Sequence, residues 1–544
     1  MANQILKPTT AGPASDPAAI LEHMQLILGL AIAAGMEAFV SSAVSLALPR
    51  IAADFSASPD EISWAVTLYL VGFAIALPGS AWCATQLGQK KFLSLCVAGY
   101  IIASIGCALT TLLPTFLAMR LIQGAAGASF VARALFTFTK EFRPPALIYV
   151  LFVLVGSFSL RAIGLPIGGL FIDEYSWRWI FWITAGVLSL AALPLLLLSR
   201  EVWPRSEQKG GDYMGFVYLV AFFGALLIAL GRGQREAWSA SPYVVTLLTA
   251  AAFALFAYIW REVEGGLGGS ILPLRLLALP QMAIGATLSF FAGFMLTSGL
   301  YVLPQFLLGV VRWDSFHVGL LMSIDSFGLM AGIAAAAWTL GKFMTRTLVV
   351  ASGLLFSLSM ILLASRMSAQ TPVEAFYLPS VLRGFAVGLA LPPIGIFSFI
   401  GIASDPRRNG QGRAWQYTIR QLGAVAGMAF VVWWLDQRLI VHSSHLGQSL
   451  SLGTSPASQY LSQVSRGLST SGLSPFTEGA AANLLLSRLV AREASILAYQ
   501  DTFGVLALIG VLVASGGLLL PRVRKSGPAQ VPQALELQSA IPPS

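Results

Sequence analysis

Leu147–Gly169 reads LIYVLFVLVGSFSLRAIGLPIGG and contains a single charged residue, Arg161. The stretch is apolar on every side, whereas a strand of a membrane barrel alternates apolar and polar residues. A helix needs about 20 residues to cross the apolar core of a bilayer, which is roughly 30 Å thick. Because only helices and closed barrels satisfy their backbone polar groups in lipid, this stretch predicts a membrane-spanning helix.

Apolar stretches of this kind recur between Leu26 and Leu520, separated by short polar breaks. The chain of 544 residues is 56% hydrophobic and only 10% charged, which is unlike a soluble domain of this length. We expect spans near 25–48, 62–83, 91–111, 114–138, 147–171, 179–199, 214–231, 242–260, 281–307, 317–340, 345–365, 376–401, 415–435 and 500–520. The sequence therefore predicts an all-α polytopic membrane protein with 14 transmembrane helices. This class of protein moves solutes, senses signals or carries out membrane-embedded catalysis.

The basic residues predict how the chain is threaded through the membrane. The net charge of +9 is scattered singly between apolar stretches, which favours cytoplasmic loops over a nucleic-acid surface. With the N-terminus inside, the cytoplasmic segments carry 18 Lys and Arg residues and the short outside loops carry 6. Met1–Glu22 lacks the pattern of a cleaved signal peptide. Both termini are therefore expected to be cytoplasmic.

The predicted spans divide the chain into two halves. We expect a cytoplasmic segment (1–24), a six-helix bundle (25–199), two extra spans with linkers (200–280), a second six-helix bundle (281–520) and a disordered tail (521–544). The second bundle includes a long outside loop (436–499), in which Ala480–Tyr499 has the apolar spacing of an amphipathic helix. Arg120 in the first half and Arg383 in the second both precede Gly-rich helix turns. Such repeats are typical of secondary transporters, whose substrate site lies where the repeats meet.

The metal-binding residue types are sparse and scattered. Cys83, Cys96 and Cys107 fall in or near two consecutive spans, which favours packing over a disulfide framework or a metal cluster. His442 and His445 lie in the predicted outside loop without a cluster of carboxylates or thiolates, so they are a weak zinc signal. Exposed loop histidines are the favoured interpretation, and no metal or cofactor is predicted.

Five motifs along the chain carry a resemblance to a known family. They are Ala47-Leu-Pro-Arg50-Ile51, Trp64-Ala-Val-Thr67-Leu-Tyr69-Leu70 with Pro78, Arg120-Leu-Ile-Gln123-Gly124, Trp177-Arg178-Trp179-Ile180-Phe181, and Arg420-Gln421-Leu422-Gly423. Over about residues 25–520 the chain resembles the fourteen-span drug:proton antiporters of the major facilitator superfamily, of the EmrB/QacA type. The resemblance implies two pseudo-symmetric six-helix bundles plus two extra central spans in a bacterial inner membrane. It also implies a periplasmic adaptor protein and an outer-membrane channel as partners.

The chain departs from the family pattern at three places. Thr85 and Gln86 replace the Asp and Arg of the loop between spans 2 and 3. The antiporter motif of span 5 reads Gly164-Leu-Pro-Ile-Gly168-Gly169, with Pro166 shifted by one position. Val40 occupies the place of the span 1 aspartate, and Glu37 lies almost one turn earlier. A uniporter or an importer of a metabolite therefore remains the alternative to a proton antiporter.

Two acids within predicted spans are candidates for proton coupling or substrate binding. An ionised side chain at mid-bilayer costs roughly 2.5–3.5 kcal/mol and needs a partner or a wet cavity. Glu37 lies near the middle of span 1, where burial would favour proton uptake, and it would be either a proton or cationic-drug site or a structural carboxylate paired with an Arg. Asp325 in span 10 would be a second proton or cation site, or a hydrated residue near the outer surface.

Basic residues within the spans complete the candidate site. The resemblance links Arg120 to proton transfer, and Gln123 could orient it through a hydrogen bond. Arg161 is expected to neutralise Glu37 or to attract an anionic substrate. Arg133 and Arg383 are expected to extend toward the membrane interfaces instead.

Helix-bending and motif residues form a second group of candidates. Small residues let membrane helices approach closely and a proline bends a helix. These properties make Gly164, Pro166, Gly168 and Gly169 candidates for a conformational hinge. Gly124, Trp177, Arg178 and Arg420 are carried over as motif residues of the family.

The function predicted from these features is proton-coupled efflux of amphipathic organic compounds by alternating access. The sequence has no H-E-x-x-H, G-x-S-x-G or Walker A motif, so an enzyme or an ATP-driven pump is not expected. The expected partners are protons, a small-molecule substrate and the lipid bilayer, and not nucleic acid.

Overall fold

The computed structural model describes residues 17–141, 146–198, 212–264, 271–339, 345–399, 402, 406–451 and 475–520. The first half of the chain forms α1 (Pro17–Asp54), α2 (Pro59–Leu87), α3 (Gln89–Leu109), α4 (Leu113–Glu141), α5 (Ala146–Glu174) and α6 (Arg178–Leu198). A pair of helices follows, α7 (Tyr213–Arg232) and α8 (Pro242–Glu264). The second half forms α9 (Pro280–Phe306), α10 (Ser315–Thr339), α11 (Thr345–Arg366), α12 (Tyr377–Ser398), α13 (Pro406–Ser451) and α15 (Pro475–Leu518). Short helical turns are η1 (Trp238–Ala240), η2 (Leu274–Leu276), η3 (Leu307–Val311) and η4 (Val373–Phe376).

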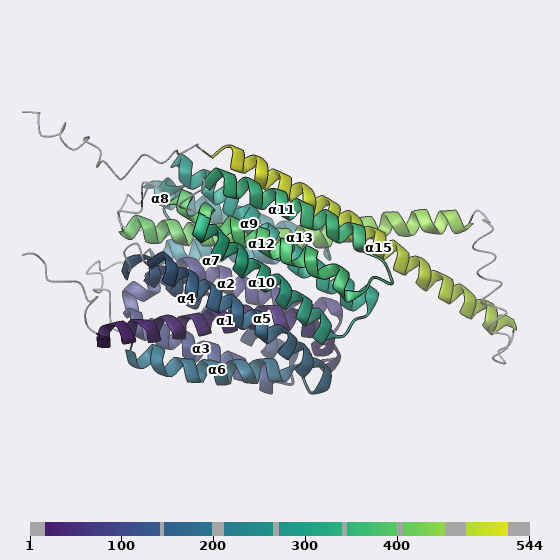
Figure 1. Ribbon diagram of the computed structural model, residues 1–544, viewed down its shortest axis with the longest axis horizontal. Helices are drawn as coiled ribbons and strands as arrows, with labels where there is room; N and C mark the ends of the chain where they lie inside the picture. Colours follow the sequence, from purple (N-terminus) through teal and green to yellow (C-terminus); the bar gives the residue numbers. More distant parts are fainter. Residues whose placement is uncertain are drawn as a thin grey trace, which may run out of the picture.

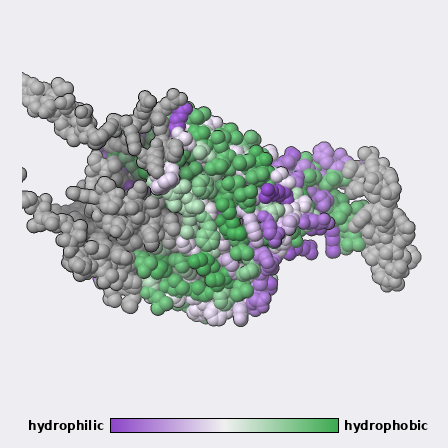
Figure 2. Space-filling model, viewed as in Figure 1, coloured by the Kyte–Doolittle hydropathy of each residue, from purple (hydrophilic) through white to green (hydrophobic). Residues whose placement is uncertain are grey.

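The helices have the length and the surface of a membrane protein. Within the described residues, 11 helices are long and apolar enough to cross a membrane, and Arg178–Ala191 is a shorter apolar helix. Figure 2 shows an apolar surface on the visible face of the body, bordered by hydrophilic residues on the side toward the projecting helices. The prediction of an all-α polytopic membrane protein is therefore confirmed. The number of 14 spans stays a prediction.

The helices gather into two halves that meet along two seams (Figure 1). In the first half, α1 packs against α5 and α6, α2 against α4, and α3 against α4 and α6. In the second half, α9 packs against α13, α10 against α12, and α11 against α12 and α15. The halves contact each other through α5 with α10 and through α2 with α13, while α7 and α8 pair with each other and α7 packs against α2. The two extra helices thus lie beside the two-half body.

The end of the molecule from which α13 and α15 extend differs from the sequence prediction. The expected loop (436–499) is helical over much of its length, because α13 continues to Ser451 and α15 begins at Pro475. The amphipathic helix predicted at Ala480–Tyr499 is part of α15 and runs without a break into the last apolar segment. Both helices project beyond the rest of the body (Figure 1), and we call this the projecting end. Residues 452–474 and the predicted tail (521–544) lie outside the described residues.

The prediction for His442 needs a similar correction, whereas His445 is exposed as predicted. His442 lies on α13, and its Nε2 is 2.7 Å from Oδ2 of Asp501 on α15. Arg438, one turn earlier on α13, pairs with the same carboxylate at 2.5 Å. His442 is therefore a helical residue bound to an acid and not an exposed loop histidine. The sequence separation of 59 residues hid this contact.

Candidate functional site

The first half buries a carboxyl group at the crossing of α1, α2 and α4. Glu37 on α1 is only 9% exposed. The hydroxyl of Tyr69 on α2 donates a hydrogen bond of 2.5 Å to its Oε1. The guanidinium of Arg120 on α4 lies over the Tyr69 ring, with its Cζ 4.2 Å from the ring centroid. Tyr69 therefore connects the acid to the arginine, which stand on different helices.

Arg120 is held in place by further hydrogen bonds. It is 1% exposed, its Nη1 donates to Oε1 of Gln123 at 2.5 Å, and its Nε donates to the Ala65 carbonyl at 3.2 Å. Gln123 in turn donates to the hydroxyl of Ser104 on α3 at 2.8 Å. The hydrogen bond predicted between Gln123 and Arg120 is therefore present. We call Glu37, Tyr69, Arg120, Gln123 and Ser104 the first-half network, and none of these five has a buried side-chain polar atom without a hydrogen-bond partner.

The glycines of α4 make room for this network. A Cβ at Gly124 would overlap the carbonyl oxygen of Tyr69 on α2. A Cβ at Gly127 would lie 3.0 Å from Cγ of Glu37 and 3.1 Å from Cε2 of Tyr100. Side chains at these positions would push α2 and Glu37 away from α4. The motif Arg120-Leu-Ile-Gln123-Gly124 thus supplies both the polar groups and the close helix approach.

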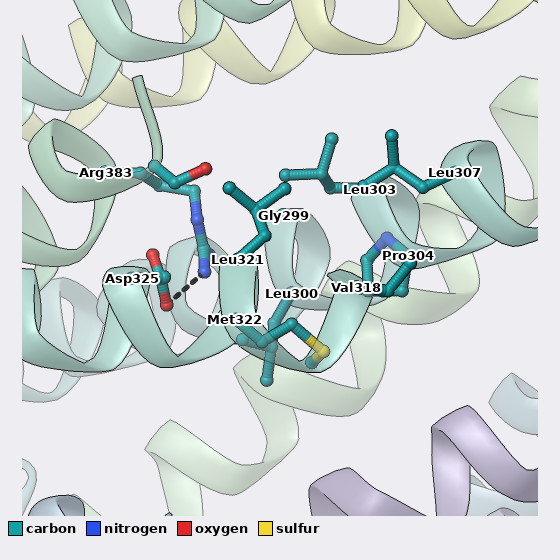
Figure 3. Close-up of a pocket in the computed structure, with 11 residues that line it drawn as sticks. Gly299, Leu300, Leu303, Pro304, Leu307, Val318, Leu321, Met322, Asp325 and Arg383 are labelled. Atoms are coloured by element: carbon teal, nitrogen blue, oxygen red, sulfur yellow. Dashed lines mark ion pairs between the residues drawn. The ribbon is translucent and has the colours of Figure 1, made fainter. Parts of the chain in front are cut away.

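The second half buries an ion pair between α10 and α12. Nη2 of Arg383 lies 2.6 Å from Oδ2 of Asp325 (Figure 3), and the two residues are 3% and 4% exposed. The expectation that Arg383 extends to an interface is therefore wrong, because its charge is compensated inside the protein. The alternative that Asp325 is hydrated near the surface is wrong for the same reason.

A small pocket adjoins this ion pair between α9, α10 and α12 (Figure 3). Its open volume is about 10 Å³, roughly the room that one water molecule needs. Three of its lining residues each carry a buried polar atom without a hydrogen-bond partner, namely Oδ1 of Asp325, Nε of Arg383 and Oγ of Ser380. The ion pair therefore leaves hydrogen-bonding capacity unused, which native proteins rarely do.

The crossings of α2 with α4 and of α10 with α12 repeat one another. A Cβ at Gly124 would meet the carbonyl oxygen of Tyr69, and a Cβ at Gly384 would meet that of Asp325. This register places Asp325 at the position of Tyr69. It also places Ser380, four residues before Gly384, at the position of Arg120. The sequence comparison matched Arg120 with Arg383, whereas the helix contacts match Arg120 with Ser380, three residues earlier. The comparison aligned residue types and not the contacts between helices.

Arg161 lies on α5, the helix of the first half that packs against α10 of the second half. It is 5% exposed, and neither its Nε nor its Nη2 has a hydrogen-bond partner. Glu37 accepts its hydrogen bond from Tyr69, and the expectation that Arg161 neutralises Glu37 or attracts an anionic substrate stays a prediction.

The candidate hinge residues of α5 lie where this helix touches two others. Cβ atoms at Gly164 and Gly168 would lie 2.6 and 3.2 Å from the ring of Phe39 on α1. A Cβ at Gly169 would lie 2.5 Å from the carbonyl oxygen of Ser315 on α10. Pro166 is inside the helix and offers no N–H to the preceding turn. These residues let α5 pack closely against α1 in the first half and against α10 in the second. Their role as a hinge stays a prediction.

Trp177 and Arg178 lie at the projecting end, away from the buried acids. Nε1 of Trp177 and Nη1 of Arg178 both bind Oδ2 of Asp54, at 2.8 and 2.6 Å. They thereby join the end of α1 to the start of α6. Arg420 on α13 has its Cζ 3.9 Å from the ring centroid of Tyr417, and its charge acts weakly on Glu37. Arg133 lies on α4, but its side chain is outside the described part of the chain.

Sequence reasoning missed the roles of Tyr69, Ser104 and Arg383 in these networks. Arg383 is the sole charged residue of α12, and Asp325 is the sole acid of α10. Two lone opposite charges in two apolar helices were the signal for an ion pair. Within the described residues, no group of three or more His, Cys, Asp or Glu side chains could hold a metal ion.

Two halves of membrane helices with ionisable residues buried where the helices cross are typical of secondary transporters. The family model of the Major Facilitator Superfamily matches residues 30–428, and the chain belongs to that superfamily. The chain is 25% identical to the multidrug export protein EmrB of Escherichia coli (strain K12) over 444 residues, which cover 79% of this chain and 84% of EmrB. It is 24% identical to the colistin resistance protein EmrB of Acinetobacter baumannii over 419 residues, which cover 75% and 79% of the two chains. The predicted resemblance to this group of exporters is confirmed.

Solved structures support the fold. A bacterial homologue of the human lysosomal transporter Spinster, in an inward-facing conformation, superposes with a TM-score of 0.55 at 14% identity, covering 93% of this chain and 97% of that one. A double Trp mutant of XylE gives a TM-score of 0.55 at 15% identity, covering 91% and 95%. At these identities the likeness shows the fold alone.

Proposed function

We propose that this protein exports amphipathic organic compounds across a bacterial inner membrane in exchange for protons. The observation that carries the proposal is the placement of Glu37. Its buried carboxyl group accepts a hydrogen bond from Tyr69, and the guanidinium of Arg120 lies over the ring of that tyrosine. The names of the relatives, which are multidrug export proteins, support the direction of transport.

Proton uptake by Glu37 would change the balance between the two conformations of an alternating transporter. Ionised Glu37 is attracted by the fixed charges of Arg161 and Arg120, which stand on α5 and α4. A proton on Glu37 removes this attraction between α1 and its neighbours. The protonated and ionised forms therefore favour different helix arrangements, and a pH difference across the membrane can drive the change between them.

Transport by inverted vesicles tests this proposal. The vesicle lumen is acidified, a pH-sensitive dye is enclosed, and amphipathic compounds are added one at a time. The wild-type protein should alkalinise the lumen when its substrate enters. Glu37→Gln should abolish this response, because the amide cannot take up a proton. Glu174→Gln, the same chemical change at an exposed position on α5, should keep it.

The results separate the proposal from its alternative. Normal alkalinisation by Glu37→Gln would overturn the role of Glu37. Accumulation of a labelled compound without any change of pH would favour a uniporter instead. The displaced Pro166 in the antiporter motif of α5 is the observation that keeps this alternative open.

We also propose that both termini are cytoplasmic and that the projecting end faces the periplasm, where an adaptor protein of an outer-membrane channel would bind it. The projecting part of α15 presents the exposed apolar side chains Leu484, Leu485 and Leu489. Replacing all three by Ser should lower export from intact cells and leave transport by inverted vesicles unchanged. Equal export from intact cells before and after the replacement would rule out this surface as the contact.

A further inference from the structure

The seam between α5 and α10 encloses buried charge at the middle of the molecule. On one side of Arg161, the hydroxyl of Ser159 on α5 lies 3.6 Å from Sδ of Met330 on α10. On the other side, Leu165 lies against Gly319, where a Cβ would be 2.6 Å from the Leu165 carbonyl oxygen. Arg161 lies between these two contacts on α5, and Asp325 lies between them on α10. The two charged residues therefore belong to the same stretch of the seam.

The buried charges near this seam do not balance. Asp325 is paired with Arg383, and Glu37 is linked to Arg120 through Tyr69. The group holds three buried arginines, Arg120, Arg161 and Arg383, against two acids, and Arg161 has two guanidinium nitrogens without a hydrogen-bond partner. Removing an ionised side chain from water without a partner is costly, so a buried arginine of this kind needs a compensating anion. Its donors suit a carboxylate, which can accept two parallel hydrogen bonds from a guanidinium.

We propose that Arg161 binds the anionic group of the transported compound, so that the preferred substrates are amphipathic organic anions such as carboxylates. This inference rests on the proposed transport function and adds the class of substrate to it. Oδ1 of Asp325, which has no hydrogen-bond partner, lies on the facing helix and can accept a hydrogen bond from a hydroxyl or amide of the same compound. An anion that leaves the cytoplasm also gains about 2.3 kcal/mol per charge at a potential of 100 mV, which assists export.

Binding of two dyes to the purified protein in lipid nanodiscs tests the inference. Fluorescein is an amphipathic anion, and rhodamine 6G is a cation built on the same fused rings. Wild-type protein should bind fluorescein more tightly than rhodamine 6G, as measured by fluorescence polarisation at a fixed pH. Arg161→Met should weaken fluorescein binding about tenfold or more, equivalent to about 1.4 kcal/mol, and leave rhodamine 6G binding within about twofold.

Two further variants act as controls. Arg161→Lys keeps the positive charge but not the two parallel hydrogen bonds, so it should lose less affinity for fluorescein than Arg161→Met does. Arg50→Met makes the same change at an arginine whose side chain is 62% exposed, and it should leave the binding of both dyes unchanged. Thermal unfolding without a dye checks the fold. Because Arg161→Met removes a buried charge that has no hydrogen-bonded acid, its melting temperature should equal or exceed that of the wild type.

Three results would overturn the inference. They are fluorescein binding by Arg161→Met that equals the wild type, preference of the wild type for rhodamine 6G, and a lower melting temperature of Arg161→Met with loss of both dyes. The assay uses no proton gradient, so it is independent of coupling. Arg161-dependent fluorescein binding together with normal transport by Glu37→Gln would support the anion site and refute the proton-coupling role of Glu37.

Discussion

The crossing of α2 with α4 and the crossing of α10 with α12 share one register of helix contacts but differ in their polar groups. In the first, the polar side chains of Glu37, Tyr69 and Arg120 all have partners. In the second, Asp325, Arg383 and Ser380 each leave a buried polar atom without a partner. The same backbone arrangement therefore carries three polar residues that all have partners in one half and three that each lack one in the other.

The difference between the two crossings is consistent with different functions for the two halves. A buried network in which every group is satisfied is rigid and holds its charges in fixed positions. A buried pair with unused donors and acceptors can accept another polar molecule without losing its own contacts. The first half is thus suited to hold a proton-binding group in place, and the second half, with Arg161 across the seam, is suited to receive a ligand.

Breaking the ion pair of the second half should have the largest effect. Arg383→Met leaves Asp325 as a buried acid without its partner, which typically costs about 3–5 kcal/mol of unfolding free energy. Denaturant titration of the purified protein in mixed micelles measures this loss. The double variant Asp325→Asn with Arg383→Met should recover much of it, because no buried charge is left uncompensated. A double variant as unstable as the single one would show that Arg383 acts through packing and not through its charge.

Because the two helix crossings share one register, substitutions at their contact glycines should lower the unfolding free energy by an intermediate amount. Gly124→Val would push α2 away from α4, and Gly384→Val would push α10 away from α12. Each should cost about 1–3 kcal/mol, the usual penalty for overpacking. Gly186→Val on α6, where a Cβ would meet no atom within 4 Å, should cost much less. Equal stability of all three variants would contradict the close helix approach.

Removing single hydroxyl groups should have the smallest effect on the unfolding free energy. It should also separate the two halves most clearly. Tyr69→Phe removes the hydrogen bond to Glu37 and should lower the unfolding free energy by about 1 kcal/mol. Ser380→Ala removes a hydroxyl that has no partner and should leave the unfolding free energy unchanged. Tyr175→Phe, at a residue that is 72% exposed, controls for the loss of a tyrosine hydroxyl. A loss for Ser380→Ala as large as that for Tyr69→Phe would remove the contrast.

Much of the fold could be predicted from the sequence because lipid imposes a simple rule on it. Apolar stretches of about 20 residues identify helices, and the repeated glycine turns identify two related halves. The extent of α13 and α15 could not be predicted in this way. Their projecting parts are polar enough to look like a loop, and their pairing through Asp501 with Arg438 and His442 joins residues far apart in the sequence.

The candidate site was predictable as a set of residues but not as a set of contacts. Glu37, Arg120, Arg161 and Asp325 stand out because each is a charge in an apolar helix. Which acid pairs with which base depends on helix packing, and packing is not visible in a single sequence. The sequence therefore left two roles open for Arg161, and it did not predict that Glu37 binds Tyr69 or that Asp325 pairs with Arg383.

The length of α13 has a mechanical consequence. Its 46 residues make a rod of about 69 Å, more than twice the thickness of the apolar core of a bilayer. One end of this rod packs in the seam with α2, and the other stands clear of the membrane body (Figure 1). A rotation of about 10° at the seam would move a point about 40 Å along the rod by about 7 Å. A helix of this length would convert a small rotation in the membrane into a larger displacement beyond it.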